Sequence, residues 1–371
     1  MNQAAGGDAF AMSPANHVYA AVAARTVFAA DGERIRRQFL EDYEHFVAQL
    51  HQWPRRHVIA VLTDIMEAER GREIRFRVYN ALRVVKAAET EEGLALLREG
   101  LDDSHQGVRH TAVMALQDAN RDAAADVSHE LQERLADPAD PLQEQRAGLL
   151  HTIAALDAPI EPETVEAAEA IYLDEDGGGD AWSQAAYLLL RAGALEEALA
   201  ALRQAGDPRQ LRAAAGACML LASHWLTPGP EPWQGGTGID AERAPALRAL
   251  RRFLLEVFDR TPADARAPDL VYAARLLFVA PVWGPEGEVH EDNDLNAALI
   301  AHLGDWIAPP EAPASTPPSE AQRQAVELLL HFEPDGAVRD QQAAHEAMQQ
   351  GQGAAEPEAF WARAETLREL Y

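Results

Sequence analysis

The sequence predicts an all-α protein made of antiparallel helix pairs stacked side by side. Alanine and leucine are abundant and long runs of β-branched residues are absent, and both features favour helix over strand. Apolar residues recur at spacings of three and four, for example at Ile35, Phe39, Tyr43, Phe46 and Leu50, which is the period of an amphipathic helix. No segment alternates convincingly with a period of two, which leaves the all-α class as the prediction.

A motif that recurs after 34 residues predicts the stacking. Arg75 stands in Ile-Arg, followed six residues on by Ala-Leu, and Arg109 stands in Val-Arg, followed by Ala-Leu at the same distance. Self-similarity at a period of roughly 20–50 residues is typical of repeat proteins. Helix pairs joined by short turns cannot bury both faces alone, so each pair is expected to pack on the next.

The first part of the chain divides into a short tail and a series of helices. Residues 1–13 are expected to form a flexible tail, and Gly, Pro, Asp and Ser mark the ends of the helices that follow. The predicted helices lie at 14–30 and 33–52, and then in three pairs at 55–69 with 72–87, 90–100 with 104–119, and 123–136 with 141–156. Together, residues 14–158 form the predicted repeat region.

The second part, residues 159–307, is expected to continue the stack with two interruptions. Helices are predicted at 163–173, 182–205, 208–226, 241–259, 268–280 and 295–307. Residues 227–240 and 281–294 are rich in proline and glycine and are predicted to be long irregular loops, which are often functional or disordered. Residues 308–318 form a Pro-rich spacer. The C-terminal helices, within 319–371, are expected at 319–332, 336–350 and 357–371.

The residues around the second helix pair resemble the HEAT family of helical repeats. The matching positions are Asp102 or Asp103, Val108, Arg109, Ala112, Ala115 and Leu116. The resemblance covers about residues 58–156 and implies a right-handed α-solenoid, in which Asp103 and Arg109 brace neighbouring repeats. It also implies that Val108, Ala112 and Leu116 pack between helices.

Two stretches depart from that family pattern. In the third copy, Gln143 stands where the repeat expects arginine, and Arg146 is the candidate substitute. Residues 193–199, within the predicted helix 182–205, resemble instead the inner half of a tetratricopeptide repeat. Both families are stacks of helix pairs, so either assignment predicts the same architecture.

Charge and the lack of targeting signals narrow the classes of function. The formal net charge is −28, which opposes binding to nucleic acid or to anionic membranes. Lys86 is the only lysine, and an acid excess with so few lysines indicates a salt-adapted host, a GC-rich genome, or both. The start lacks the basic region of a signal peptide, and no apolar run reaches the roughly 18 residues of a membrane span. A cytoplasmic protein is therefore expected.

The clearest candidate surface lies on the predicted helix 72–87. On a helical projection, a stripe of basic and aromatic residues takes one side, and the apolar residues take the other and are expected to face the core. The stripe consists of Arg72, Arg75, Phe76, Tyr79, Arg83 and Lys86. Basic and aromatic groups together can hold an acidic peptide, a phosphate or a base. The opposing interpretation is that the arginines pair with acids on adjacent repeats.

Two tryptophans and one cysteine are the remaining candidates. Trp233 and Trp283 lie in the two Pro/Gly-rich stretches, where each either anchors a partner or pins its own loop. Cys218, the single cysteine, lies among small apolar residues, which indicates a buried inert thiol. The acidic residues 174–180 lack EF-hand spacing, and no Cys/His set suits zinc. We therefore expect no catalytic residue, no cofactor and no metal.

Two main functions remain open. The first, which we favour, is a non-enzymatic scaffold that binds another protein through a face of the helical stack. The alternative is a HEAT-like nucleic-acid-binding protein, or an enzyme of the DNA-glycosylase type, that uses the basic stripe at 72–86. A continuous positive face would favour this alternative, and a neutral or acidic face would favour protein partners. A third possibility is a subunit of a larger assembly that docks through residues 308–371.

Overall fold

The chain folds into two compact helical units, Met1–Ala158 (unit 1) and Pro159–Tyr371 (unit 2). The computed structural model describes residues 31–68, 71–156, 158–174, 176, 178–228, 237–262, 265, 267–283, 289–290, 292–307, 317–332, 360–361, 364–365 and 367–368. The expected tail 1–13, helix 14–30 and helix 336–350, most of the spacer 308–318, and Trp233 lie outside the described residues.

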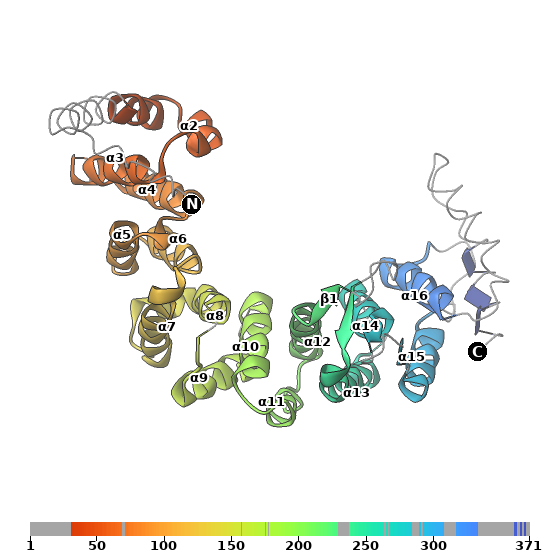
Figure 1. The fold of residues 1–371 in the computed structure, drawn as a ribbon. Coiled ribbons are helices and arrows are strands. Elements are labelled where there is room, and N and C mark those ends of the chain that lie inside the picture. Colours follow the sequence, from red (N-terminus) through yellow and green to blue (C-terminus); the bar gives the residue numbers. More distant parts are fainter. Residues whose placement is uncertain are drawn as a thin grey trace, which may run out of the picture. The chain divides into compact units, whose positions relative to one another are not determined.

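Unit 1 consists of helices joined by short turns (Figure 1). Residues 31–41 are helical, and the elements after them are α2 (Tyr43–Gln49), the 3₁₀ helix η1 (Leu50–Gln52), α3 (Arg55–Ala68), α4 (Arg72–Val84), η2 (Ala87–Glu89), α5 (Glu91–Leu101), α6 (Gln106–Leu116), α7 (Arg121–Ala136), η3 (Pro141–Gln145) and α8 (Arg146–Ala155). The prediction of helices is confirmed here. The helix predicted at 72–87 ends earlier, at Val84, so Lys86 follows the helix rather than lying on it.

Polar side chains in the turns fix where the helices begin. The Thr90 hydroxyl accepts a hydrogen bond from the backbone N–H of Gly93 at 3.1 Å, at the start of α5. The Asn120 side chain does the same for Ala123 at 3.0 Å, at the start of α7. Each side chain satisfies an N–H that the first turn of a helix leaves unpaired, and each such cap stabilises its helix by about 1 kcal/mol.

The helices of unit 1 form two layers. Helix α4 packs on α6 and α6 on α8, and we call these three helices the even layer. Helix α3 packs on α5, and with α7, which packs on α8, these form the odd layer. Between the layers lie fully buried side chains, among them Leu62, Leu82, Leu97, Leu116 and Leu131. Burying each such leucine contributes about 1.5–3 kcal/mol, so this interface is the core of the unit.

Contacts between successive helix pairs keep a nearly constant separation in sequence. Examples are Arg55 with Glu89 and Gln117 with His151, both 34 residues apart, Arg109 with Glu144, 35 apart, and Arg98 with Glu130, 32 apart. A constant separation means that a side chain of one pair reaches the same place on the next pair. The contact register therefore has the period of the sequence motif.

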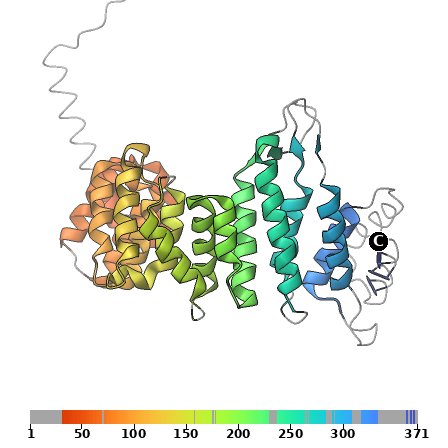
Figure 2. The ribbon, with the colours of Figure 1, turned by 90° about the horizontal axis from the view of Figure 1, so that it is seen from below.

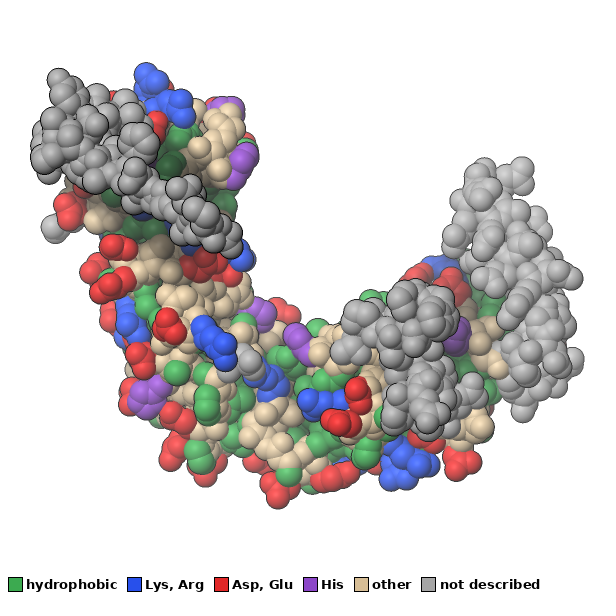
Figure 3. Space-filling view, in the orientation of Figure 1, with side chains coloured by type: hydrophobic (Ala, Val, Ile, Leu, Met, Phe, Trp, Pro, Cys, Tyr) green, Lys and Arg blue, Asp and Glu red, His purple; other side chains and the backbone are tan. Residues whose placement is uncertain are grey.

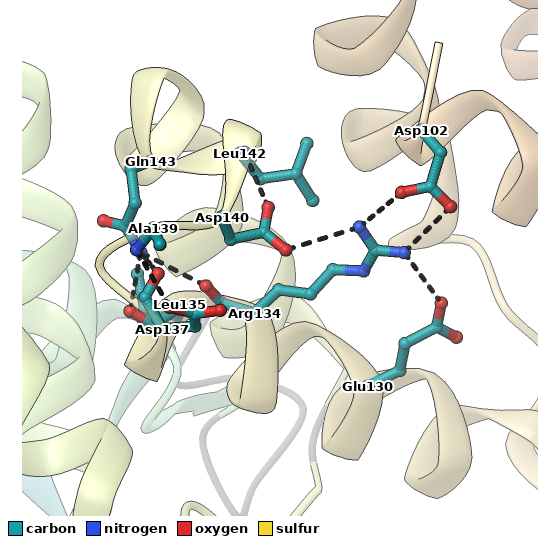
Figure 4. Close-up of polar contacts among 9 residues, drawn as sticks. All are labelled: Asp102, Glu130, Arg134, Leu135, Asp137, Ala139, Asp140, Leu142 and Gln143. Carbon is teal, nitrogen blue, oxygen red and sulfur yellow. Dashed lines mark hydrogen bonds and ion pairs between the residues drawn. The ribbon is translucent and has the colours of Figure 1, made fainter.

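Arg134 on α7 joins acids from two neighbouring turns (Figure 4). Its guanidinium donates to both carboxylate oxygens of Asp102, at 2.8 and 3.2 Å, and lies 3.5 Å from the carboxylate of Asp140. Glu130, one turn back on α7, completes the cluster at 4.0 Å. Because Asp102 ends α5 and Asp140 precedes η3, Arg134 ties two successive helix pairs together.

Gln143 ends helix α7 and so explains the departure of the third copy from the repeat pattern. Its amide nitrogen donates to the backbone oxygens of Arg134, Leu135 and Asp137 at 3.1, 2.9 and 2.9 Å (Figure 4). The last carbonyls of a helix have no partner within the helix. A neutral amide supplies the donor here, whereas the longer arginine of the preceding copies reaches an acid on a neighbouring turn.

Unit 2 is also helical but contains four short strands. Its elements are α9 (Pro162–Leu173), α10 (Gly179–Ala192), α11 (Leu195–Leu202), α12 (Pro208–Ser223), β1 (Leu226–Pro228), β2 (Thr237–Asp240), η5 (Ala241–Arg243), α13 (Ala244–Arg260), α14 (Pro268–Val279), β3 (Val282–Trp283), β4 (Val289–His290), α15 (Asn293–Trp306) and α16 (Glu320–His331). Residues 360–361, 364–365 and 367–368 are helical as well. No helix in the described part of the chain has the length and apolar character needed to cross a bilayer.

The helices of unit 2 also form two layers. Helix α10 packs on α12, α12 on α14 and α14 on α16, while α11 packs on α13 and α13 on α15. Buried polar groups join the layers. The Tyr172 hydroxyl on α9 lies 3.2 Å from the carbonyl oxygens of both Leu202 and Gln210, which can each accept its hydrogen bond. The Gln210 side-chain amide donates in turn to the carbonyl of Tyr172 at 2.7 Å.

The two stretches predicted to be irregular loops each form a hairpin, and the hairpins pair with each other. The sheet order is β1-β2-β3-β4, with antiparallel pairing inside each hairpin and parallel pairing between β2 and β3. Ile239 lies opposite Val282, and both are buried. The prediction of loops at 227–240 and 281–294 is therefore corrected, because the runs that flank their tips are strands.

The position of the hairpins in the helix stack explains why they meet. Strands β1 and β2 connect α12 to α13, and β3 and β4 connect α14 to α15. Since α12 packs on α14 and α13 on α15, the two connections leave the same end of adjacent helix pairs (Figure 2). Each hairpin is therefore paired with a strand of the other hairpin, and one hairpin alone would lack this partner.

Candidate functional site

The two layers of unit 1 carry different charges. The even helices α4, α6 and α8 contain six arginines and one acidic residue, Glu73. The odd helices α3, α5 and α7 contain nine acidic residues and five arginines, and acidic side chains gather along the edge formed by α5 and α7 (Figure 3). In a chain with a net charge of −28, the even layer is thus locally basic, and it would attract an acidic partner.

Helix α4 presents two cations and two apolar side chains to solvent. Arg72 and Arg83 are exposed, and neither side chain forms an ion pair or hydrogen bond within the part of the chain that the structure describes. Phe76 is 43% exposed and Val84 is 48% exposed. Large apolar side chains that remain this exposed beside unpaired cations are typical of a surface that contacts a partner.

Of two other members of the predicted stripe, Tyr79 is buried and Arg75 is half-buried. Tyr79 is 3% exposed, and its hydroxyl donates to the carbonyl of Leu96 at 3.0 Å. Burial raises the pKa of this hydroxyl well above its ordinary value of 10.0, so the side chain is a neutral hydrogen-bond donor. The Nε atom of Arg75 lies 2.8 Å from a carboxylate oxygen of Asp103. The expectation that Arg75 and Tyr79 share an exposed surface with Phe76 is therefore corrected.

The reason is that the next helix pair covers that side of α4. Helix α4 packs against α5 and α6, and Gly100 on α5 leaves room for the Tyr79 ring, since a Cβ atom at Gly100 would lie 2.2 Å from the ring. The exposed arc of α4 is consequently turned away from Arg75 and Tyr79, toward Arg77 and Val84. Arg77 pairs with Glu73 and lies over the ring of Tyr43, 5.3 Å from its centre.

Lys86, the last member of the stripe, lies beyond the end of α4. Its backbone has φ of 53°, and it is the only non-glycine residue with positive φ in the part of the chain that the structure describes. This left-handed backbone ends α4, and the Lys86 Nζ atom reaches the carboxylate of Asp118 at 3.3 Å. Its side chain stays 56% exposed, so the amine remains accessible to solvent.

A depression of about 340 Å³ opens at this end of α4. Its apolar wall is formed by Val47, Leu50, Trp53, Val84 and Val85. Basic residues complete the lining, namely His51, Arg55 and Lys86, and none of the described residues that line it is acidic. His51, Trp53 and Arg55 are not among the site residues predicted from the sequence, although Trp-Pro-Arg-Arg directly after a predicted helix combines an aromatic residue with cations at a helix boundary.

The residues that match the HEAT pattern lie at the contacts between helix pairs. Val108, Ala112 and Leu116 on α6 are fully buried. Arg109 is 8% exposed and donates to the carbonyl of Asp103 at 3.0 Å and to the carboxylate of Glu144 at 2.9 Å. Arg75, the arginine of the preceding motif copy, forms an ion pair with Asp103 in the turn of the next helix pair.

The structure leaves the predicted roles of the two tryptophans untested. Trp233 lies outside the described residues, and Trp283 is placed in strand β3, where it lies opposite Asp240 and Val289. The structure therefore describes the backbone position of Trp283 alone.

The single cysteine is buried, and the described residues hold no candidate metal cluster. Cys218 is fully buried, and burial raises the pKa of its thiol far above the ordinary 9.0, which keeps it protonated and unreactive. Among the described residues, no group of three or more His, Cys, Asp or Glu side chains is arranged to hold a metal ion. The even face of unit 1 offers hydrogen bonds, cations and an apolar depression.

Comparison with protein-family models and with curated proteins finds no match for this chain. The functional assignment therefore depends on the surface of unit 1 and on the arrangement of its helices.

Proposed function

We propose that the protein is a non-enzymatic scaffold, a HEAT-like α-solenoid that binds another protein through the even layer of unit 1. The observation that carries the proposal is the constant register of contacts between helix pairs. Arg109 reaches Glu144 and Gln117 reaches His151 at separations of 35 and 34 residues. Stacks built in this way present one continuous face made of equivalent helices, and such faces are used for binding.

The composition of that face supports a protein partner over a nucleic acid. Three of its six arginines are held by acids of the chain itself, since Arg75, Arg77 and Arg109 pair with Asp103, Glu73 and Glu144. Of the other three, Arg146 begins α8, while Arg72 and Arg83 lie on α4 with Phe76 between them. Proteins that track a phosphate backbone need a row of free cations. Isolated cations beside apolar groups complement the surface of a partner protein better than they complement a phosphate backbone.

An affinity capture experiment tests this function. The full chain and an Arg72→Glu, Arg83→Glu variant would be used as baits in lysate of the source cells, with and without nuclease, and captured proteins identified by mass spectrometry. The expected result is a protein that survives nuclease treatment and disappears with the variant. An Arg252→Glu, Arg275→Glu variant makes the same change in charge at exposed sites in unit 2 and should keep the partner.

The basic character of the even helices also favours one alternative function, which is nucleic-acid binding or a glycosylase-type activity through α4. Gel-shift titration of the wild type with duplex and single-stranded oligonucleotides at about 50 mM salt tests it. Micromolar binding that falls with the Arg72→Glu, Arg83→Glu variant and steeply with salt would replace the scaffold by this alternative. No binding at 50 mM salt would leave a protein partner as the function to pursue.

A further inference from the structure

We infer that the depression at the end of α4, with the exposed ridge of α4 beside it, binds a short acidic peptide segment that inserts one large apolar side chain. This inference rests on the proposed scaffold function and names its partner. The site consists of the depression lined by Leu50, Trp53 and Lys86 and of the ridge formed by Phe76 and Arg83.

The size and lining of the depression define the anchor. A volume of about 340 Å³ is at the lower end of the range of small-ligand pockets and accommodates one large side chain rather than a folded element. The walls contributed by Val47, Leu50, Val84 and Val85 are aliphatic, and the Trp53 ring stacks on Phe46 with centres 5.8 Å apart. This stacking holds Trp53 in place, so the wall is formed before any partner arrives.

The charges around the depression define the rest of the segment. His51, Arg55 and Lys86 are basic, and the lining contains no acid among the residues that the structure describes. Arg55 pairs with Glu89 and Lys86 with Asp118, yet their side chains remain 36% and 56% exposed. Ion pairs this exposed are weak, so both cations can also bind a partner carboxylate. In a chain of net charge −28, a locally basic apolar depression selects an acidic ligand over a neutral or basic one.

The ridge of α4 sets the length of the segment. From Arg72 to Val84, where α4 ends, the chain advances about 18 Å along the helix axis, at roughly 1.5 Å per residue. An extended peptide covers that distance with about six residues. Phe76 and Arg83 lie within this span, on the exposed side of α4, and so can contact the same segment that fills the depression.

A library of random seven-residue peptides displayed on phage, selected on the immobilised full chain, tests the inference. We expect enrichment of peptides with two or more acidic residues and one Leu, Ile, Phe or Trp. The consensus peptide, synthesised with a fluorescein label, should bind in fluorescence anisotropy and should lose at least tenfold in affinity with a Val84→Asp, Lys86→Glu variant. A Tyr272→Asp variant, which places an acid at the most exposed large apolar residue of unit 2, should bind normally.

Folding defects are separated from binding defects by a second variant. Lys86→Gly suits the left-handed backbone at this position and removes the charge. The variant should therefore keep the melting temperature and still reduce the affinity for the peptide several-fold. Enrichment of basic or uncharged peptides would overturn the inference, as would unchanged affinity in both variants. Competition by single-stranded DNA as strong as by unlabelled peptide would also overturn it, because the site would then recognise phosphate.

Two further outcomes keep this inference distinct from the scaffold function. Peptides that match the chain's own acidic residues 161–176, together with dimers in size-exclusion chromatography that the Val84→Asp, Lys86→Glu variant abolishes, would make a second copy the occupant and overturn the partner named here. A captured protein that depends on Arg72 and Arg83, combined with failure of all peptide selection, would keep the scaffold and reject the peptide site.

Discussion

Units 1 and 2 are both two-layered helical stacks, yet they join their helix pairs differently. In unit 1 most of the polar contacts between pairs recur at 31–37 residues, with Arg75–Asp103 at 28, and they are ion pairs or side-chain hydrogen bonds. In unit 2 the corresponding pair Arg203–Glu256 is separated by 53 residues, and Arg260 reaches the carbonyls of Arg203 and Ala205 across 57 and 55. The longer separations reflect the hairpin inserted between α12 and α13.

The difference shows that a helical stack tolerates insertions at one end of its pairs without losing its layers. The hairpins lengthen the connections in unit 2, while α10, α12, α14 and α16 still pack in succession. Buried polar contacts accompany this change. Arg251 is 4% exposed, donates to the carbonyl of Leu277 at 2.8 Å and lies over the Phe278 ring. Unit 1 keeps the regular register, and both units carry surface ion pairs, whose strength depends on salt.

The largest expected effect comes from the close approach of α4 and α5 in unit 1. Gly100→Ala would place a Cβ atom 2.2 Å from the Tyr79 ring and 2.9 Å from Ala112. The ring cannot move aside without breaking its hydrogen bond to Leu96. We expect a loss of about 3 kcal/mol in unfolding free energy, at the upper end of overpacking effects. Guanidinium unfolding followed by circular dichroism, with hydrogen exchange of α4 to α6, measures it.

Gly216→Ala on α12 in unit 2 is the matched control. Nothing lies within 4 Å of a Cβ atom at Gly216, so alanine should stabilise the helix by up to about 1 kcal/mol through its higher helix propensity. If Gly100→Ala were as harmless as Gly216→Ala, the close contact of Tyr79 with α5 would not exist in solution.

A smaller effect is expected from the arginines that join helix pairs. Arg109→Met keeps the apolar stem but removes the donor to the carbonyl of Asp103 and to Glu144. Because Arg109 is 8% exposed, we expect a loss of about 2 kcal/mol, mostly from the carbonyl left without a donor. Arg203→Met in unit 2 breaks a pair whose side chains are 35% and 45% exposed, and should cost less than about 1 kcal/mol.

Guanidinium unfolding of the two variants, run in parallel, measures the difference. Equal losses in both would mean that burial does not distinguish the two units. A larger loss for Arg203→Met would reverse the comparison and place the more important ion pair in unit 2.

The helical class was predictable from the sequence, because amphipathic spacing and turn residues are local signals. The part of α4 that is exposed was not predictable. The spacing of residues along α4 determines which side chains share a side, but α5 and α6 determine how much of that side is covered. That coverage depends on Gly100 and Asp103, which belong to another helix pair. Tyr79 was therefore grouped with Phe76 although only Phe76 is exposed.

The hairpins of unit 2 show a second limit. Val282-Trp283 and Val289-His290 are pairs of strand-forming residues around a Gly- and Pro-containing tip, which is a hairpin signal. Strands of two residues are too short to show alternation, and they are stabilised by pairing with Ile239, 43 residues away. The partner-binding role of Arg72, Phe76, Arg83 and Lys86 stays a prediction.

A pH effect of about 1 kcal/mol or less is expected at Arg134. Its hydrogen bonds hold the pKa of Asp102 below the usual 3.8. A lowered carboxyl pKa gives stability that is present above pH 4 and is lost as the pH falls through the folded-state pKa. Because Asp102 is 69% exposed, solvent screens the pair and the effect stays near 0.5–1 kcal/mol.

The measurement compares the wild type with Arg134→Met in urea at pH 7 and at pH 3. We expect the stability difference at pH 7 to shrink at pH 3, with faster hydrogen exchange at the α5 and η3 turns in the variant. Arg209→Met in unit 2 is the control, because its partner Asp207 has a lowered pKa as well but lies on the same turn. A difference that persists at pH 3 would show that Arg134 acts through packing rather than through its ion pairs.

The smallest effect on stability is expected at Lys86, where stability and binding should separate. Glycine relieves the left-handed strain of φ 53°, but it adds unfolded-state entropy and removes a mostly exposed pair with Asp118. These contributions nearly cancel, so Lys86→Gly should stay within about 0.5 kcal/mol of wild type. Lys86→Val removes the same charge but forces a β-branched residue into the left-handed region, and should cost about 1–2 kcal/mol. Urea unfolding of both variants distinguishes them. Equal losses would mean that Lys86 does not adopt the left-handed backbone, and the end of α4 and its depression would then need another description.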